Sequence, residues 1–232
     1  DEGTPNLYKH IYTDDRIKQL LSEDGKLYII PNYGINYNAE IKDYNGPAFH
    51  IQKKVIAWNN YVVPKTLNEY FDLIERYVAE NPTTEEGTPY TGFAILCEGW
   101  RHFCLINPVQ HLIGRPNDGE VVLDIHDPNY YTETFVDKPY AKPYYKKLNE
   151  EFNKGLINRD TFAMNYDQYI AALSNGTVLG MFDQGWDFGT ATSSLTDAKM
   201  YENTYLALPL LPPRHALHSP RSRSEERRVG KE

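Results

Sequence analysis

The sequence predicts an α/β fold. Segments with apolar residues at helical spacing alternate along the chain with short apolar runs of strand length. A turn at Asn175-Gly176 joins the end of one helix to the buried strand Val178–Phe182. Asp183, Gln184 and Trp186 follow that strand directly. Open α/β sheets keep their ligands at the carboxyl ends of their strands, so this stretch is the first candidate for a recognition site.

Composition limits the classes of protein to be considered. The chain has 232 residues, of which 41% are hydrophobic, and this is enough for a packed core. No apolar run approaches the roughly 20 residues of a membrane span. Tyrosine is the outlier, with 19 copies against 9 Phe and 3 Trp. Such amphipathic rings are common where polar ligands are held, although they also fill the faces of sheets.

The net charge of −8 is unevenly distributed. Residues 212–232 carry six Lys or Arg and three Asp or Glu, so the rest of the chain, with 18 basic and 29 acidic residues, has a net charge of −11. An acidic body of this kind argues against nucleic acid as a partner.

Both ends of the chain are unusual. The run Arg223–Glu232 looks like the in-frame translation of a sequencing adapter, so we expect residues 212–232 to be a non-native disordered tail. Asp1-Glu2-Gly3 has neither an initiator Met nor a basic and apolar signal segment. We therefore expect a fragment with both ends missing.

The first third of the chain begins with a short helix from Thr13 that has apolar residues on one face. Asp24-Gly25 then turns the chain into the strand Lys26–Pro31, which proline ends. The run Asn32–Asn38 that follows is rich in aromatic and amide side chains. It is too polar for a core and too aromatic for an ordinary solvated loop.

The clearest helix begins after Thr66. A strand at 48–51 and a short helix at 52–58 precede it. Thr66 is its expected N-cap, with Glu69 at the capping-box position and apolar residues at helical spacing after it. Asn81-Pro82 ends it.

The remaining elements continue the alternation of strands and helices. In chain order we expect a buried strand at 90–96, a segment at 97–104 entering a helix, a hairpin of 121–124 with 131–135, a helix at 140–154 ended by Gly155, a short helix capped by Asp167 and running to Leu173, and a strand at 205–210.

The two cysteines favour free thiols. If Cys97 and Cys104 lay on one helix they would be about 10 Å apart along its axis, which is beyond the reach of a disulfide. A metal site needs more ligands than the sequence provides near them, and His102 and His111 do not have ligand spacing. We expect no metal and no cofactor.

Catalytic patterns are few. Asp183 and Glu98 would form the paired carboxylates of a glycosidase if the fold brought them together, but the sequence gives no separation between them. There is no Gly-x-Ser-x-Gly elbow, no phosphate loop and no dinucleotide-binding Gly-rich turn. Binding is therefore the better class than catalysis.

Three segments, in this order and spacing, resemble the extracellular solute-binding proteins, family 1, of ABC importers, which include sugar-binding lipoproteins of Gram-positive bacteria. The segments are Asp24–Pro31, Pro64–Tyr70 and Ser174–Trp186, and the resemblance covers about residues 13–211. It implies a periplasmic-binding-protein type II fold, in which two α/β lobes are joined by crossing strands and close by hinge motion around a ligand.

The resemblance also implies a domain organisation. Residues 1–31 correspond to the end of the first lobe and a crossing strand, residues 32–206 to the second α/β lobe, and residues 207–211 to the returning hinge strand. The chain would then hold mostly the second lobe, with parts of the interlobe hinge.

Ligand contacts follow from the same resemblance, residue by residue. Trp186 matches the aromatic residue that stacks on the ligand after the Gly-Met strand, with a core position at the base of the loop as the alternative. A flat ring buries the C–H groups of a sugar while polar neighbours bond to its hydroxyls. Asp183 and Gln184 would be such neighbours, or would cap the turn.

Further contacts are implied on other segments. Trp100 stands where the family often places a second aromatic contact, flanked by Glu98 and Arg101, and Arg101 could equally pair with a surface carboxylate. Tyr33 and Asn36 follow the first crossing strand and would either face the cleft or pack in the hinge. The Tyr-rich loop 32–45 departs from the family pattern.

These features favour an extracellular solute-binding component of an ABC importer that captures an oligosaccharide and delivers it to membrane permeases, and not an enzyme. Two Trp residues with polar neighbours suit a neutral polyol better than an anion, which needs an Arg cluster. A hydrolase using Asp183 and Glu98, a glycan-binding or sensing lipoprotein without transport, and a peptide or other small ligand stay open. We expect a monomer, lipid-anchored at the cell surface or periplasmic, that touches the membrane only through an anchor outside this chain.

Overall fold

In a computed structural model of the chain, the described residues are 21–26, 28, 46–115, 119–124, 128–129 and 131–210. The chain divides into two units, Asp1–Asp43 and Tyr44–Glu232, and every element below belongs to the second. In the first unit the turn at Asp24-Gly25 is confirmed, since Gly25 has φ +73°. The helix from Thr13 and the run at 32–38 lie outside the described residues, as does most of the strand ending at Pro31. The domain boundaries stay predictions.

A four-stranded mixed sheet forms the centre of the second unit, in the order β2-β5-β1-β6. β1 (Pro47–Gln52) lies antiparallel to β5 (Val178–Gln184) and to β6 (Tyr205–Leu208), whereas β2 (Thr91–Ala94) is parallel to β5. All of β5 except its last residue is buried, because strands flank it on both sides and helices cover both faces. The four strands expected here from the sequence are confirmed, with β2 and β6 shorter than predicted.

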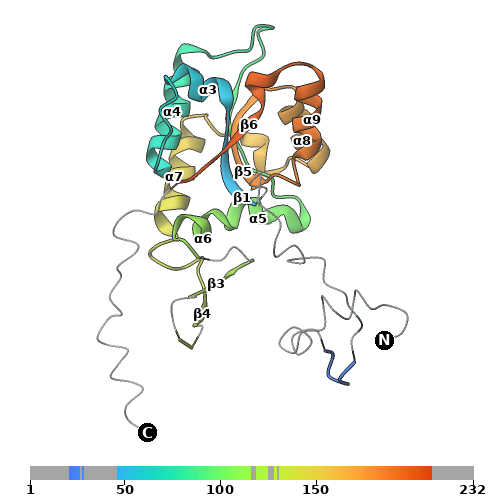
Figure 1. Cartoon of the computed structure of the whole chain (residues 1–232). Coiled ribbons are helices and arrows are strands. Elements are labelled where there is room, and N and C mark those ends of the chain that lie inside the picture. The colour runs from blue at the N-terminus through green and yellow to red at the C-terminus, as the bar shows by residue number, and fades with distance from the viewer. Residues whose placement is uncertain are drawn as a thin grey trace. The chain divides into compact units, whose positions relative to one another are not determined.

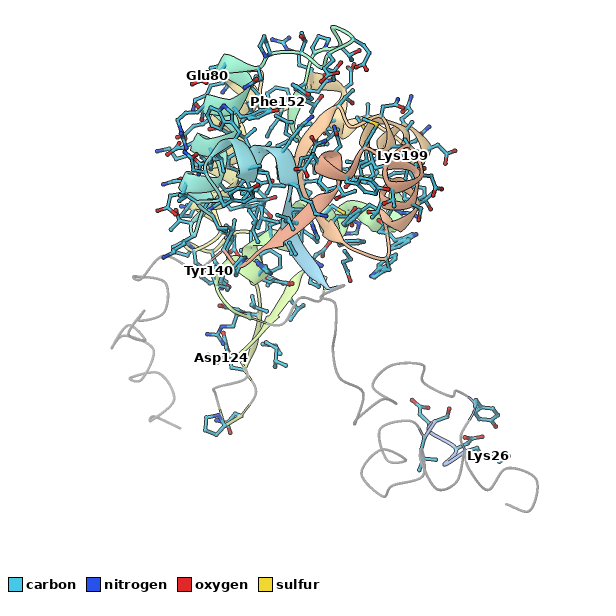
Figure 2. The ribbon with its side chains drawn as sticks, turned by 45° about the horizontal axis from the view of Figure 1, so that its top comes forward. Lys26, Glu80, Asp124, Tyr140, Phe152 and Lys199 are labelled. Atoms are coloured by element: carbon cyan, nitrogen blue, oxygen red, sulfur yellow. The ribbon has the colours of Figure 1, made fainter. Side chains whose placement is uncertain are left out.

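Helices cover both faces of this sheet, as Figure 1 shows. α4 (Leu67–Glu80), α6 (Pro108–Leu112) and α7 (Lys142–Asn153) pack on the face that carries Phe49 and Phe93. The other face is covered by α5 (Phe103–Ile106), α8 (Tyr166–Ser174) and α9 (Gly189–Asp197). In Figure 2 the labelled Glu80, at the end of α4, and Lys199, just after α9, stand on opposite sides of the molecule. The predicted α/β class is confirmed as a layered sheet and helix structure.

Local capping signals explain where α4 begins. The Thr66 side chain accepts a hydrogen bond from the Glu69 amide, and the Glu69 carboxylate accepts from the Thr66 amide, both at 3.2 Å. This is the predicted capping box. The apolar stripe of the helix is buried, as its spacing predicts, and Asn81 ends it.

The start of α8 corrects the sequence prediction. Asn165, and not Asp167, is the N-cap, because its side chain and that of Gln168 form a second capping box. Asp167 lies inside the first turn, where a carboxylate interacts favourably with the helix dipole but caps no amide. The helix therefore begins at Tyr166.

The cysteine segment is also more broken than expected. A 3-10 turn, η1 (Gly99–His102), leads into the short α5, and Pro108 starts α6. Gly99 has φ +54°, and proline at the first helical position cannot continue the preceding helix. Cys97 thus precedes the helical segment, and both cysteines are free thiols, as predicted.

The other elements agree with the sequence. The short helix α3 (Lys53–Trp58) follows β1, and β3 (Val121–Leu123) pairs antiparallel with β4 (Thr132–Thr134) as the expected hairpin. Two 3-10 turns complete the description, η2 (Arg159–Phe162) and η3 (Tyr201–Asn203). In the described part of the chain no helix has the length and apolarity to cross a membrane.

Gly180 in β5 provides a test of the packing. A Cβ at this position would overlap the hydroxyl of Tyr70, which is fully buried and donates to the His50 carbonyl at 2.7 Å. We predict that Gly180→Ala lowers the free energy of unfolding in urea by about 1–3 kcal/mol, because an overfilled core must shift backbone or side chains.

The matched control is Gly189→Ala in α9, where nothing lies within 4 Å of an added Cβ and stability should not fall. In the Gly180→Ala background, Tyr70→Phe should cost less than it does alone, because it removes the overlapping hydroxyl. Equal effects of the two glycine substitutions would contradict the packing described for β5.

Candidate ligand-binding site

Two exposed tryptophans meet at one edge of the sheet. Because β2 and β5 are parallel, with Ala94 opposite Met181, their carboxyl ends lie side by side. The chain after β2 leads to Trp100 in η1, and the chain after β5 turns to Trp186. The two indole rings lie 5.9 Å apart between centroids at an interplanar angle of 12°. They are 57% and 49% exposed, although each belongs to a residue type that proteins usually cover.

Phe103 completes this aromatic cluster, by which we mean Trp100, Phe103 and Trp186. Its ring centroid lies 5.8 Å from that of Trp100 and 6.3 Å from that of Trp186. The three centroids form a nearly equilateral triangle, so Phe103 and Trp186 lie on the same side of Trp100. Phe103 is buried and supports the two exposed rings from the protein side.

Gln184 holds the ring of Trp186. The indole N–H of Trp186 donates to Gln184 Oε1 at 2.8 Å. This bond fixes the orientation of the amide, because Oε1 is its acceptor atom and Nε2 carries both donor hydrogens. Gln184 is half-buried and adjoins the exposed ring, so the structure brings these two predicted site residues together.

Asp183 lies below the site. Its side chain is 0% exposed, on the sheet face that α5 and α8 cover. Oδ2 accepts from the Tyr169 hydroxyl at 2.8 Å, and Oδ1 accepts from the Gln184 amide at 2.7 Å and from the Cys104 thiol at 3.5 Å. In this structure Asp183 therefore offers no oxygen to a ligand, in contrast to the contact expected from the sequence, because its carboxylate is needed to satisfy these donors.

Arg101 pairs with a carboxylate that the sequence analysis did not single out. Its Nε lies 3.0 Å from Oδ1 of Asp187, a residue that is only 2% exposed. The guanidinium carbon also lies 3.7 Å from the ring centroid of Tyr166 and 4.5 Å from that of Trp100. Of the two roles left open for Arg101, the structure shows pairing, but with a buried carboxylate and not a surface one.

Glu98 fastens the same region to α8. Its Oε2 accepts a hydrogen bond of 2.7 Å from the amide of Tyr166, the first residue of that helix. This amide has no partner within the helix, so the carboxylate satisfies it and interacts with the helix dipole. The Tyr166 hydroxyl in turn donates to the Asp187 carbonyl at 2.7 Å. Glu98 and Asp183 are thus both engaged in structural hydrogen bonds and do not form an exposed catalytic pair.

Four residues that matter at the site were not predicted: Phe103, Tyr166, Tyr169 and Asp187. A signal existed for Tyr166, since the capping box from Asn165 to Gln168 places it at the start of α8. No local pattern indicates that Asp187 is buried. Tyr33 and Asn36 lie outside the described residues, so their roles stay predictions.

Cys104, Asp183 and Asp187 form a buried polar cluster whose ligand-type atoms lie within 4.8 Å of one another. Burial raises the pKa of Asp183 to about 7, and the nearby Asp187 charge adds to the effect. Burial also raises the pKa of the Cys104 thiol well above its usual value. A proton on Asp183 and the Arg101 cation can therefore balance both carboxylates. Thiolate and carboxylate are ligand types that Zn²⁺ accepts, but the balance of charge within this cluster requires no ion.

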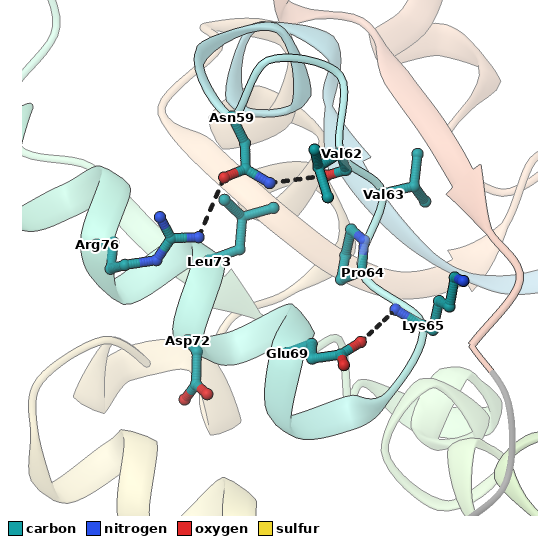
Figure 3. Close-up of a pocket in the computed structure, with 9 residues that line it drawn as sticks. All are labelled: Asn59, Val62, Val63, Pro64, Lys65, Glu69, Asp72, Leu73 and Arg76. Carbon is teal, nitrogen blue, oxygen red and sulfur yellow. Dashed lines mark hydrogen bonds between the residues drawn. The ribbon is translucent and has the colours of Figure 1, made fainter.

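Two hollows on the described surface share no residue with the aromatic cluster. One, of about 450 Å³, lies between α4 and the loop after α3 and is drawn in Figure 3. Its polar groups bond to one another: Arg76 donates to Asn59, Asn59 to the Val62 carbonyl, and the Lys65 amide to Glu69. These bonds fold the loop onto α4, and we assign the hollow no ligand.

Comparison with known proteins supports the fold. No protein-family model and no curated protein sequence matches the chain. Solved structures do, among them the Streptococcus pneumoniae ABC-transporter substrate-binding protein FusA in complex with kestose, at a TM-score of 0.61 and 19% identity over 92% of this chain. An HMO-binding solute-binding protein from Bifidobacterium longum infantis gives 0.61 and 17% over 89%, and a chitin oligosaccharide binding protein gives 0.52 and 18% over 91%.

The chain shares its α/β fold with part of these solved substrate-binding proteins. This confirms the fold class predicted from the sequence. The chain covers 41%, 41% and 47% of the three solved chains, so it spans less than half the length of the structures it matches. At identities below 20% the likeness concerns the fold alone.

Two buried groups at the site should titrate in opposite directions. The pKa of Asp183 is raised from 3.8 to about 7, so its folded state holds a proton that the unfolded state releases, and its contribution to stability is lost as pH rises from about 4 to 7. Burial lowers the pKa of His50 from 6.5 to about 4, and its contribution is lost as pH falls through the same window. The His50 ring contacts the Asp183 carbonyl at 3.2 Å.

The pH dependences of Asp183 and His50 have opposite signs and offset each other in the unsubstituted chain. We predict that Asp183→Asn removes one of them and reveals the other. Asparagine can keep an acceptor toward the Gln184 amide and direct its NH₂ to the Tyr169 hydroxyl, so the fold should survive. The stability of the variant relative to the unsubstituted chain should rise with pH between about 4 and 7, by up to about 1.4 kcal/mol per pH unit. Urea unfolding across this range measures it, and a difference independent of pH would show that Asp183 is ionised throughout.

Proposed function

We propose that this chain is part of an extracytoplasmic solute-binding protein of an ABC importer and that its ligand is a carbohydrate. The observation that carries the proposal is the exposed, parallel pair Trp100 and Trp186 at the carboxyl ends of two adjacent strands. Flat apolar faces bordered by polar groups are what the C–H faces and hydroxyls of a sugar require. The proteins of similar fold that carry sugar or oligosaccharide ligands in their names support the same class.

Three predicted contacts supply polar groups at the rim of the aromatic cluster. The Gln184 Nε2 donors and the second carboxylate oxygen of Glu98 would turn to the ligand, since the bonds described for these side chains, to Trp186 and to Tyr166, use Gln184 Oε1 and Glu98 Oε2. The terminal nitrogens of Arg101 would donate to the ligand, because the described ion pair with Asp187 goes through Nε and compensates the charge. Because that cation is already paired, the site suits an uncharged polyol better than an anion. Asp183 would act indirectly, because its carboxylate accepts a hydrogen bond from the Gln184 amide and so positions that residue.

The chain would provide one wall of the site. It spans less than half the length of the similar solved structures, and in the family it resembles the ligand lies between two lobes. We assign the opposite wall to a first lobe joined through residues 1–31 and 207–211, with Tyr33 and Asn36 near the junction. Delivery to membrane permeases and anchoring by lipid or retention in the periplasm belong to the same proposal.

A glycan hydrolase is the second candidate, and the geometry weighs against it. Retaining and inverting glycosidases both need two carboxyl groups that flank the scissile bond. Here Asp183 is fully buried and Glu98 is bonded to the start of α8. A glycan-binding protein without transport would share the same site and is separated from an importer by uptake of the sugar in cells.

We predict that sugar binding depends on Trp186. The complete protein containing this chain, in a Trp58→Phe background, should show a saturable change in tryptophan fluorescence with an oligosaccharide such as kestose or chitotriose. Trp186→Ala should weaken binding by at least about tenfold, because the stacking face is removed. The unfolding midpoint in urea should stay close to that of the parent, which shows that the fold is retained.

Trp58→Phe is also the matched control. Trp58 packs against Tyr77 and Arg76 on α4, so its replacement should leave the affinity unchanged. Release of product from any oligosaccharide would favour the hydrolase. Absence of a saturable signal across a panel of neutral oligosaccharides would falsify the carbohydrate proposal.

A further inference from the structure

The two exposed tryptophans are held in different ways. Trp186 is fixed by its own hydrogen bond to Gln184. Trp100 lies in the short 3-10 turn η1 and is 57% exposed. In the described structure its contacts are ring contacts: Trp186 and Phe103 by stacking, and Arg101 through the guanidinium. An exposed indole on a four-residue turn needs such an external support to keep one orientation.

Arg101 provides that support. Its guanidinium carbon lies close to the rings of both Tyr166 and Trp100, at 3.7 and 4.5 Å from their centroids. Planar guanidinium groups stack on aromatic faces, whereas the ammonium of lysine acts as a point charge. Tyr166 is itself fastened at both ends, by its amide to Glu98 and by its hydroxyl to the Asp187 carbonyl. The arginine therefore connects Trp100 to a fixed ring of α8.

Asp187 determines where the guanidinium lies. Its Oδ1 is 3.0 Å from Arg101 Nε, and its side chain is 1% exposed against 21% for that of Arg101. A buried carboxylate has little freedom, so the pair orients the arginine and not the reverse. The sequence position adds a geometric link, since Asp187 directly follows Trp186. The same short turn therefore carries Trp186 and also Asp187, which pairs with the arginine that contacts Trp100.

We infer that Asp187 is a positioning residue which, through Arg101, holds Trp100 parallel to Trp186. It thereby sets the shape of the ligand platform, by which we mean the exposed faces of these two rings. That these two rings bind a ligand rests on the proposed function, whereas the contacts of Asp187, Arg101 and Trp100 do not depend on it. A platform ordered before the ligand arrives avoids the entropic cost of ordering two large side chains on binding. Asp187 and Arg101 would therefore act on affinity without Asp187 touching the ligand.

The test uses the optical coupling of the two indoles. Two indoles whose centroids lie 5.9 Å apart couple excitonically, and the couplet expected in the far-ultraviolet circular dichroism of the unliganded 232-residue chain has a size set by the angle between their transition dipoles within the two ring planes. In a Trp58→Phe background a couplet between two tryptophans can come only from Trp100 and Trp186, because the chain has 3 Trp, and the signal of the backbone and the other aromatic residues is removed by subtracting the spectrum of the Trp186→Phe variant. We expect Asp187→Asn to reduce the couplet by about half or more, and Arg101→Lys, which keeps the charge but loses the plane, to reduce it similarly.

Asp197→Asn at the exposed end of α9 is the matched control and should leave the couplet unchanged. Thermal unfolding of each variant shows whether the fold is retained, and Arg101→Lys, at a partly exposed position, keeps the test valid if Asp187→Asn unfolds the chain. A full couplet in folded Asp187→Asn and Arg101→Lys chains overturns the inference.

Titration of the same variants of the complete protein with kestose separates the inference from the proposed function. We expect a loss of affinity of about tenfold in Asp187→Asn and in Arg101→Lys. Unchanged affinity with a lost couplet overturns the positioning role. If the parent protein binds no oligosaccharide while the variants lose the couplet, the proposed ligand is wrong and the structural role of Asp187 stands.

Discussion

The parallel pairing of β2 with β5 is the contact on which the candidate site depends. Parallel strands end at the same edge of a sheet, and here that edge receives η1 from one strand and the turn 185–188 from the other. An antiparallel β2 would send Trp100 to the opposite edge. The antiparallel pairing of β1 with β5 on the other side completes the burial of β5. The pairing of β5 with its two neighbours thus buries the centre of the sheet and also fixes the position of the two exposed rings.

The buried carboxylates beneath the exposed rings orient the residues of the site, and burying them costs free energy of folding. Asp183 and Asp187 are buried side chains, Arg101 is the cation paired with Asp187, and the pKa of each carboxyl is raised because burial disfavours the ionised form. Apolar residues of similar size often stabilise a core at least as well as buried ion pairs do. What the charged groups add here is direction: each hydrogen bond or ion pair fixes one backbone amide, ring or guanidinium at the edge of the sheet.

The chain is similar to solved sugar-binding proteins in fold but not in sequence. Identities of 17–19% with solved sugar-binding proteins accompany TM-scores of 0.52–0.61 over most of the chain. A layered α/β core tolerates wide substitution as long as apolar volume and pattern are kept. Ligand specificity has no such tolerance, because it depends on a few side chains at the rim. The likeness therefore supports the architecture, and the proposal of a carbohydrate ligand rests on the aromatic cluster and its polar neighbours.

By itself the sequence determined the class of fold and the capping box of α4, because helical period, strand length and capping are local properties, and it predicted where a ligand would bind. The resemblance to the solute-binding family pointed to Trp100 and Trp186, and both follow buried strands. Only the tertiary structure decided that Asp183 points inward and that Arg101 pairs with Asp187, 86 residues away. No local pattern records such pairings, because which face of a strand end is covered depends on helices that come from elsewhere in the chain.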